Sequence, residues 1–274
     1  MPGLLAMDEF GTGEPLVLVH GIATDRSIWE LVVHELARTR RVVTLDVPGF
    51  GASAPVGDDF ALREVADQIV AGLAEAGISA PFDLVGHSLG GGISITLAAA
   101  YPQLVRRLVL VAPAGLRPLP AAISNLLAAS ADAVLAARRG AAPLTDTWWG
   151  RRLLLVLTAA DAAELPPTTA RQMIEASAAA KRTAPALATI TSADLRLPLA
   201  HTQMPLGVIW GEADRTVPIR ALEDLLEARP DAAVVRIAAA GHVPMVERPA
   251  EFVAALRTLI QDVTTSPPEP SIFR

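Results

Sequence analysis

The chain has 274 residues, is 51% hydrophobic and carries a formal net charge of -6 at pH 7. It contains no cysteine, which excludes disulfides, thiolate catalysis and cysteine-bound metal, and its arginines are scattered rather than clustered, so we expect no nucleic-acid partner. The first ten residues lack the basic segment of a secretory signal and no uncharged apolar run is long enough to cross a bilayer, so we expect a cytoplasmic protein without a membrane span.

Four short apolar runs in the first half of the chain predict strands that are buried on both faces. Helical patterns lie between these runs, at residues 27–37, 62–77 and 93–102. Because strands that alternate with helices build a parallel sheet, we predict an α/β fold with a mostly parallel central sheet and helices on both faces. The four strands are predicted at residues 16–20, 42–46, 82–86 and 108–112.

The alternation stops after Pro113. Residues 115–202 are rich in alanine and leucine and show no clear strand, so we predict a helical cap inserted into the sheet domain. Strand patterns resume at residues 206–211 and 233–238, and a last helix is predicted at about residues 247–262. The predicted division is a core at 1–114 and 203–263, a cap at 115–202, and a proline-rich, disordered tail at 264–274.

The stretch "LVGHSLGGG" places Ser88 directly after a predicted strand and directly before a predicted helix. This is the context of the nucleophile elbow, Gly-x-Ser-x-Gly, in which a strained turn presents a serine hydroxyl. Side chains two residues before and after the serine would collide in so tight a turn, which explains Gly86 and Gly90. Ser88 is therefore the predicted nucleophile, with a glycine-rich turn that holds an incidental serine as the alternative.

A serine hydroxyl needs a base that takes its proton and an acid that orients this base. His242 follows the last predicted strand, and loops that follow parallel strands share one edge of the sheet with the elbow. Asp214 follows the preceding strand and is the predicted acid, with Glu212 as the alternative. The resulting order of Ser88, Asp214 and His242 is the chain order of one hydrolase fold.

Charge that develops on a substrate carbonyl oxygen needs preorganised N–H donors, the oxyanion hole. The backbone N–H of Leu89, at the start of the predicted helix, is one expected donor. The other is expected from the loop after "LVLVHG", where Ile22 is the predicted donor and Ala23 follows it. Gly21 lets the backbone turn toward the substrate in this interpretation, whereas a simple turn is the alternative.

Several motifs together resemble the α/β-hydrolase superfamily, in its capped branch of Gly-x-Ser-x-Gly serine hydrolases. The resemblance covers residues 16–260 except the insert, and it implies that the insert forms a helical lid over the active site. The motifs are "LVLVHG", "LDVPGFGAS", "LVGHSLGG", "VIWGEADRTVP" and "GHVPMVERPAEF".

The predicted function is hydrolysis of a carboxylic ester, a lactone or a thioester through an acyl-enzyme. The resemblance leaves two alternatives open, a C–C bond hydrolase of a vinylogous diketone and a non-hydrolytic biosynthetic or ligand-binding member. C–C hydrolases usually carry a Gly/Ser-rich oxyanion loop and a tryptophan after the histidine. Here the loop reads "HGIATD" and Val243 follows His242, which weakens the first alternative.

The composition of the cap suggests a small-molecule substrate that is largely apolar. Trp148 and Trp149 are the candidate substrate contacts, although two tryptophans in a cap also suit its own core. The histidines lack ligand spacing such as H-E-x-x-H, so we expect neither a metal nor an organic cofactor. The oligomeric state does not follow from the sequence.

Overall fold

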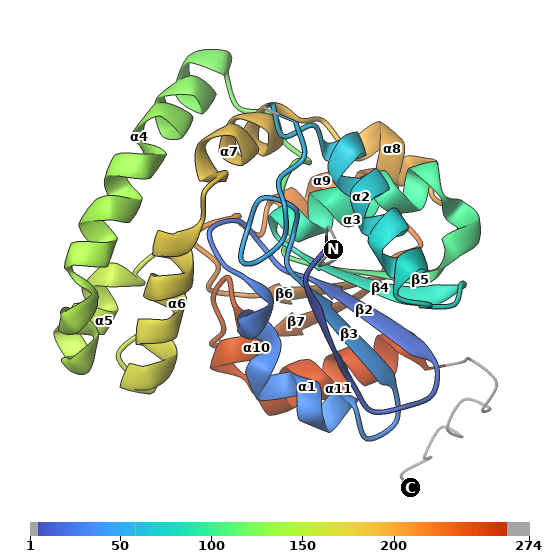
Figure 1. Cartoon of the computed structure of the whole chain (residues 1–274), viewed down its shortest axis with the longest axis horizontal. Coiled ribbons are helices and arrows are strands. Elements are labelled where there is room, and N and C mark those ends of the chain that lie inside the picture. The colour runs from blue at the N-terminus through green and yellow to red at the C-terminus, as the bar shows by residue number, and fades with distance from the viewer. Residues whose placement is uncertain (1–4, 58, 262–274) are drawn as a thin grey trace, which may run out of the picture.

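A seven-stranded sheet, in the order β1-β3-β2-β4-β5-β6-β7, runs through the middle of the molecule (Figure 1). The computed structural model describes residues 5–57 and 59–261. Strand β1 is antiparallel to β3, and every other neighbouring pair is parallel. The predicted mostly parallel α/β sheet is confirmed. The strands are β1 (Met7–Phe10), β2 (Pro15–Val19), β3 (Arg41–Leu45), β4 (Phe82–His87), β5 (Val105–Val111), β6 (Leu206–Gly211) and β7 (Ala233–Ile237).

Six of these strands coincide with the predicted apolar runs to within a few residues, but β1 was not predicted. Its central residues, Asp8 and Glu9, are exposed, because β1 lies at the edge of the sheet. An edge strand with one solvated side lacks the continuous apolar run on which the prediction depended. By contrast, every residue of β2, β4 and β6 is buried.

Helices cover both faces of the sheet, as predicted (Figure 1). Alternating side chains of β2 supply both layers: Val17 and Val19 belong to one hydrophobic core, and Leu16 and Leu18 to the other. The first core includes residues of α2 (Leu62–Glu75), α3 (Leu89–Ala100) and α9 (Ala221–Ala228). The second includes residues of η1 (Arg26–Trp29), α1 (Glu30–Leu36), α10 (Pro244–Glu247) and α11 (Pro249–Ile260).

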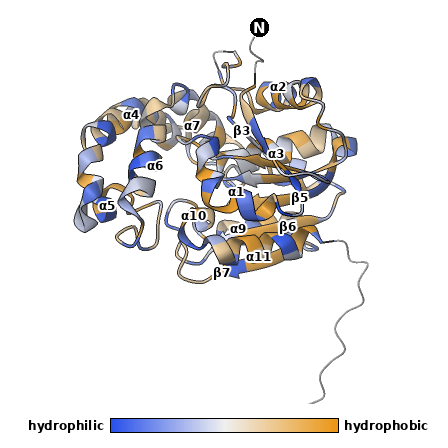
Figure 2. Cartoon of the chain, turned by 60° about the horizontal axis from the view of Figure 1, so that its bottom comes forward, coloured by the Kyte–Doolittle hydropathy of each residue, from blue (hydrophilic) through white to orange (hydrophobic). Residues whose placement is uncertain are grey.

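The chain between β5 and β6 forms helices, and we call residues 115–202 the cap segment. Figure 1 shows α4 to α6 projecting to one side of the sheet, and Figure 2 shows hydrophobic and hydrophilic residues interspersed along α4 and α6. The first residue of the segment lies beside a residue near its end, because Leu195 N–H donates to Gly115 O at 2.8 Å. The helices are α4 (Ala121–Gly140), η3 (Ala142–Asp146), α5 (Trp148–Leu154), α6 (Pro167–Ala179), α7 (Thr183–Ser192) and α8 (Arg196–Ala200).

The short helix η2 (Pro102–Leu104) links α3 to β5. Among the described residues, no helix combines the length and apolar character needed to cross a membrane. The predicted disordered tail at 264–274 lies outside the described residues.

Candidate active site

Ser88 occupies a sharp turn between a buried strand and a helix. Strand β4 ends at His87, α3 begins at Leu89, and Ser88 itself has φ 53° and ψ -116°. A positive φ in a residue with a side chain costs about 1–3 kcal/mol and persists only where the surrounding structure enforces it. The Ser88 N–H donates to Val111 O at 3.0 Å, and its carbonyl accepts from Gly91 N–H at 2.9 Å, so both backbone groups of the serine are fixed.

The two glycines that flank the serine are required by crowding, as predicted. A β-carbon on Gly86 would overlap the carbonyl of Gly90 and the hydroxyl of Ser94. A β-carbon on Gly90 would overlap the backbone carbonyls of β2 and of His20. The helix that starts at Leu89 therefore approaches the sheet more closely than any side chain allows at these positions.

His242 and Asp214 form a buried hydrogen-bonded pair. His242 Nδ1 lies 2.7 Å from Asp214 Oδ2, and the Asp214 side chain is fully buried. The other carboxylate oxygen, Oδ1, accepts the N–H groups of Thr216 at 2.8 Å and Val217 at 3.0 Å. An ionised aspartate so held accepts the Nδ1 proton of the imidazole, which leaves Nε2 free to accept a proton. Glu212, the alternative acid, has an exposed side chain.

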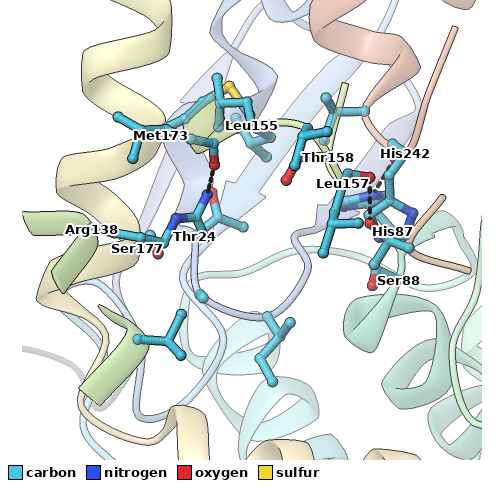
Figure 3. A pocket seen from close by; sticks show the side chains of 18 of the residues that line it. Thr24, His87, Ser88, Arg138, Leu155, Leu157, Thr158, Met173, Ser177 and His242 are labelled. Atoms are coloured by element: carbon cyan, nitrogen blue, oxygen red, sulfur yellow. Dashed lines mark hydrogen bonds between the residues drawn. The ribbon is translucent and has the colours of Figure 1, made fainter. Parts of the chain in front are cut away.

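Ser88 and His242 line one cavity of about 430 Å³. Figure 3 shows both side chains with His87 on one side of this cavity. The serine comes from the end of β4, and the histidine comes from the loop after β7. The structure therefore brings the predicted serine and the His242–Asp214 pair to the same edge of the sheet.

Of the two predicted oxyanion donors, Ile22 lines the same cavity, whereas Leu89 is buried directly after Ser88 and is not among the lining residues. Leu89 is the first residue of α3, where the N–H groups have no partner within the helix. His20 fixes the loop that carries Ile22: its Nε2 accepts Val47 N–H at 2.8 Å, so its Nδ1 carries the proton and donates to Gly21 O at 2.7 Å. Burial lowers the pKa of His20, which keeps the ring neutral and this tautomer in place.

His87 is a site residue whose role the sequence did not reveal, although it adjoins the serine. Its Nε2 donates to the carbonyl of His242 at 2.8 Å, and the two imidazole rings lie 4.7 Å apart. Burial first, and the neighbouring His242 second, hold the pKa of His87 well below 6.5. His87 is thus a neutral donor that anchors the backbone of His242, and its buried Nδ1 has no hydrogen-bond partner among the described residues.

The cap segment is attached to the loops that carry Asp214 and His242. The side chains of Arg215 and Thr216 donate to Val156 O and Leu157 O, at 3.2 and 2.8 Å. Leu157 also lines the cavity. These bonds to backbone carbonyls hold residues 156–157 of the cap segment against the loop that carries Asp214. The sequence does not reveal such contacts, because any residue supplies a carbonyl.

Most of the cavity wall that the cap contributes is apolar, and part of it is open to solvent. Val134, Leu153 and Leu157 line the cavity and are 52, 62 and 61% exposed. Trp148 and Trp149 are 62 and 46% exposed, but they are not among the lining residues. The structure does not bring these two tryptophans to the cavity, because they lie in the first turn of α5 whereas Leu153 and Leu154 at its end line the cavity wall.

Comparison with known proteins adds three matches. A model of the alpha/beta hydrolase family matches residues 16–255. A 2-hydroxymuconate semialdehyde hydrolase of Pseudomonas sp. (strain CF600) is 41% identical over 112 residues, which are 40% of each chain. A pimeloyl-[acyl-carrier protein] methyl ester esterase of Aliivibrio fischeri (strain ATCC 700601 / ES114) is 29% identical over 91% of this chain and 95% of its own.

Among solved structures, a thermophilic esterase from Thermogutta terrifontis superposes with a TM-score of 0.79 at 25% identity. That likeness covers 93% of this chain and 92% of the other. The matches at 41 to 44% identity are shorter and span 28 to 40% of those relatives' lengths.

Proposed function

The chain belongs to the alpha/beta hydrolase family, and from this premise we propose that it is a serine hydrolase that cleaves carboxylic esters through an acyl-enzyme on Ser88. The observation that carries the proposal is the 2.7 Å pairing of His242 Nδ1 with Asp214, beside a strained serine that lines the same cavity. Relatives that are named esterases and that align over most of both chains support an ester rather than another acyl compound.

In the proposed reaction, Ser88 Oγ attacks the ester carbonyl carbon while His242 Nε2 takes its proton. The N–H groups of Leu89 and Ile22 stabilise the oxyanion. The imidazolium, held by Asp214, then gives the proton to the departing alcohol, which leaves the acyl group on the serine. Water, activated by the same imidazole, releases the acid and restores the serine.

We also propose that residues 115–202 act as a cap domain on a core of residues 1–114 and 203–263. Its contribution to the cavity wall is mainly aliphatic, which favours a small-molecule substrate with an apolar portion.

The proposal is tested with p-nitrophenyl esters from acetate to palmitate, on the wild type, Ser88→Ala and Ser192→Ala. Ser192 is exposed on α7, and its hydroxyl bonds to carbonyls of its own helix and to no other described residue, so its removal controls for the loss of a hydroxyl. We expect Ser88→Ala to lose about 10⁴-fold or more in turnover and Ser192→Ala to keep wild-type activity. A folded Ser88→Ala protein that still hydrolyses the esters at a comparable rate would overturn the mechanism.

A C–C bond hydrolase is a second candidate, because a relative named 2-hydroxymuconate semialdehyde hydrolase is 41% identical over 112 residues. The discriminating substrate is a vinylogous diketone, assayed beside the best ester. Faster Ser88-dependent turnover of the diketone than of any ester would replace the ester proposal. Tight binding of either compound without Ser88-dependent turnover would favour a non-hydrolytic member of the family.

A further inference from the structure

One charged side chain, Arg138 of α4, lines the otherwise largely apolar cap wall of the cavity. Its Nη2 donates to Leu154 O at 2.9 Å. Its Nε is fully shielded from solvent and has no hydrogen-bond partner among the described residues. Burial lowers the pKa of Arg138, because desolvation disfavours its charged form.

Among the described residues, no carboxylate in the cavity pairs with this guanidinium. The described residues that line it include no aspartate and no glutamate, and no ion pair of Arg138 occurs in the described part of the chain. A cation removed from water without a counter-charge destabilises a protein unless a ligand supplies the missing charge.

A second unsatisfied polar group lies in the same wall. Ser177 of α6 lines the cavity and is 3% exposed, and its Oγ has no hydrogen-bond partner among the described residues. Figure 3 shows Arg138 and Ser177 together, across the cavity from Ser88, His87 and His242. Two buried polar groups without a hydrogen-bond partner among the described residues thus lie in the cavity wall on the side away from the serine.

Two other arginines of the cap segment have their donors used in structural contacts. Arg151 donates to Thr145 O at 3.0 Å and to Ala163 O at 2.8 Å, so it ties two turns of the cap together. Arg171 pairs with Asp146 at 2.6 Å on the surface. Arg138 has one backbone acceptor, Leu154 O, and it also lines the cavity.

We infer that Arg138, assisted by Ser177, binds a carboxylate of the substrate, so that the ester cleaved at Ser88 carries a second, ionised carboxyl group at its remote end. This inference rests on the proposed function. A guanidinium matches the geometry of a carboxylate and forms charge-assisted hydrogen bonds with it. Leu155 and Met173 line the cavity as well, and they suit the methylene chain that would join the two ends.

The substrate test compares charged and neutral esters of equal length. Monomethyl esters of dicarboxylic acids, from succinate to sebacate, place the carboxylate on the acyl side, with methyl esters of alkanoic acids as neutral partners. Acetate esters of ω-hydroxy acids place it on the alcohol side, with alkyl acetates as partners. We expect kcat/KM of the wild type to be about 10- to 100-fold higher for the charged member of one series, the range expected for hydrogen bonds to a charged group.

Arg138→Met should abolish this preference, so that the charged and neutral members of each series have similar kcat/KM values. Methionine fills a similar volume without a charge, and Arg138→Lys, which keeps the cation but not its planar fork, should retain part of the preference. Ser177→Ala should lower it by a smaller factor. Arg152→Met is the matched control, because Arg152 is an exposed cap arginine that does not line the cavity.

A binding measurement separates this inference from the proposed function. Calorimetry would follow binding of the free dicarboxylates and of matched alkanols to Ser88→Ala, with and without Arg138→Met. Serine-dependent hydrolysis with no charge preference, unchanged in Arg138→Met and Arg138→Lys, would overturn the subsite and leave the ester hydrolase intact. Binding of dicarboxylates that is lost in Arg138→Met, in a protein that cleaves no ester, would support the subsite and overturn the proposed function.

Discussion

The backbone N–H of His242 donates a 2.9 Å hydrogen bond to the carbonyl oxygen of Thr158, so the proposed base is attached directly to the cap segment. Glu247 reinforces this attachment from the other side. Its Oε1 accepts Gly241 N–H at 2.8 Å, and its Oε2 accepts Ala160 N–H at 2.7 Å. The loop that carries the proposed base and this part of the cap segment are therefore linked by one direct hydrogen bond and by a two-bond bridge through Glu247.

Replacing Glu247 should loosen that link. Glu247→Gln keeps one acceptor oxygen but turns an amide N–H₂ toward the second backbone donor, so one buried N–H loses its partner. We expect the free energy of unfolding to fall by about 1–3 kcal/mol, together with lower ester turnover, measured by urea denaturation and initial rates. Glu251→Gln, at an exposed position of α11, should change neither quantity. Equal behaviour of the two variants would contradict the proposed role of Glu247.

Comparing Asp214→Asn with Glu212→Gln tests which of the two residues is the acid that orients His242. The asparagine oxygen satisfies the N–H groups of Thr216 and Val217, which leaves its amide N–H₂ to face His242 Nδ1. Nδ1 then has to accept, the proton moves to Nε2, and the ring no longer takes the serine proton. We expect kcat to fall about 10⁴-fold in Asp214→Asn and to stay at the wild-type level in Glu212→Gln. The reverse pattern in steady-state rates would assign the acid to Glu212.

The loop that carries Ile22 should depend on His20, which holds the Gly21 carbonyl. In a trans peptide the carbonyl of Gly21 and the N–H of Ile22 point in opposite directions, so fixing one orients the other. His20→Phe preserves the ring but removes both hydrogen bonds. We expect kcat to fall about 10-fold or more with little change in KM, less than the 10²–10³-fold loss when a donor itself is removed. His34→Phe, on the exposed side of α1, provides the control.

A large rise of KM with an unchanged kcat in His20→Phe would indicate a role in substrate binding instead. Folding is checked by circular dichroism, because Gly21 O and Val47 N–H both lose a partner in this variant.

Two buried histidines should make stability depend on pH in the acid range. The pKa values of His20 and His87 lie below 6.5 because burial disfavours the imidazolium, whereas in the unfolded chain both rings protonate near 6.5. Below about pH 6.5 the unfolded state therefore binds more protons, and the free energy of unfolding falls by up to about 1.4 kcal/mol per pH unit for each histidine. Urea denaturation from pH 5 to 8 should show this slope, and His87→Gln should reduce it. An identical slope in wild type and variant would show that His87 titrates alike in both states.

Most of the fold and the candidate serine, acid and base can be predicted from the sequence, because their signals lie in short contiguous stretches. A buried strand, a tight turn and a helix are contiguous around Ser88, and the candidate acid and base each follow their own apolar strand. Strand β1 could not be predicted in this way, because Asp8 and Glu9 face solvent at the sheet edge and the strand has no continuous apolar run. The triad roles and the oxyanion donors remain predictions until the variants above are measured.

The wall of the cavity could not be predicted in the same way. In an amphipathic helix, periodicity separates two faces but does not identify the neighbour of each face. An arginine such as Arg138 normally indicates solvent, and tryptophans such as Trp148 and Trp149 normally indicate burial, whereas here the arginine lines the cavity and the tryptophans do not. Tertiary packing alone decides that the carbonyl of Thr158 accepts the hydrogen bond from His242 N–H.

The hydrogen bond between Leu195 and Gly115 has a consequence for the evolution of such a protein. Since most of the insert begins and ends at adjoining points, one helical segment can be exchanged for another, by recombination or in the laboratory, without moving Ser88, Asp214 or His242. Near the site, a transplanted segment needs backbone carbonyls where Val156, Leu157 and Thr158 lie and a backbone N–H where Ala160 lies, all of which every non-proline residue provides. Side-chain contacts such as Arg117 with Asp224 would have to be replaced as well. Under the proposed function, replacing this segment would change the cavity wall and hence the substrate while Ser88, Asp214 and His242 stay in place.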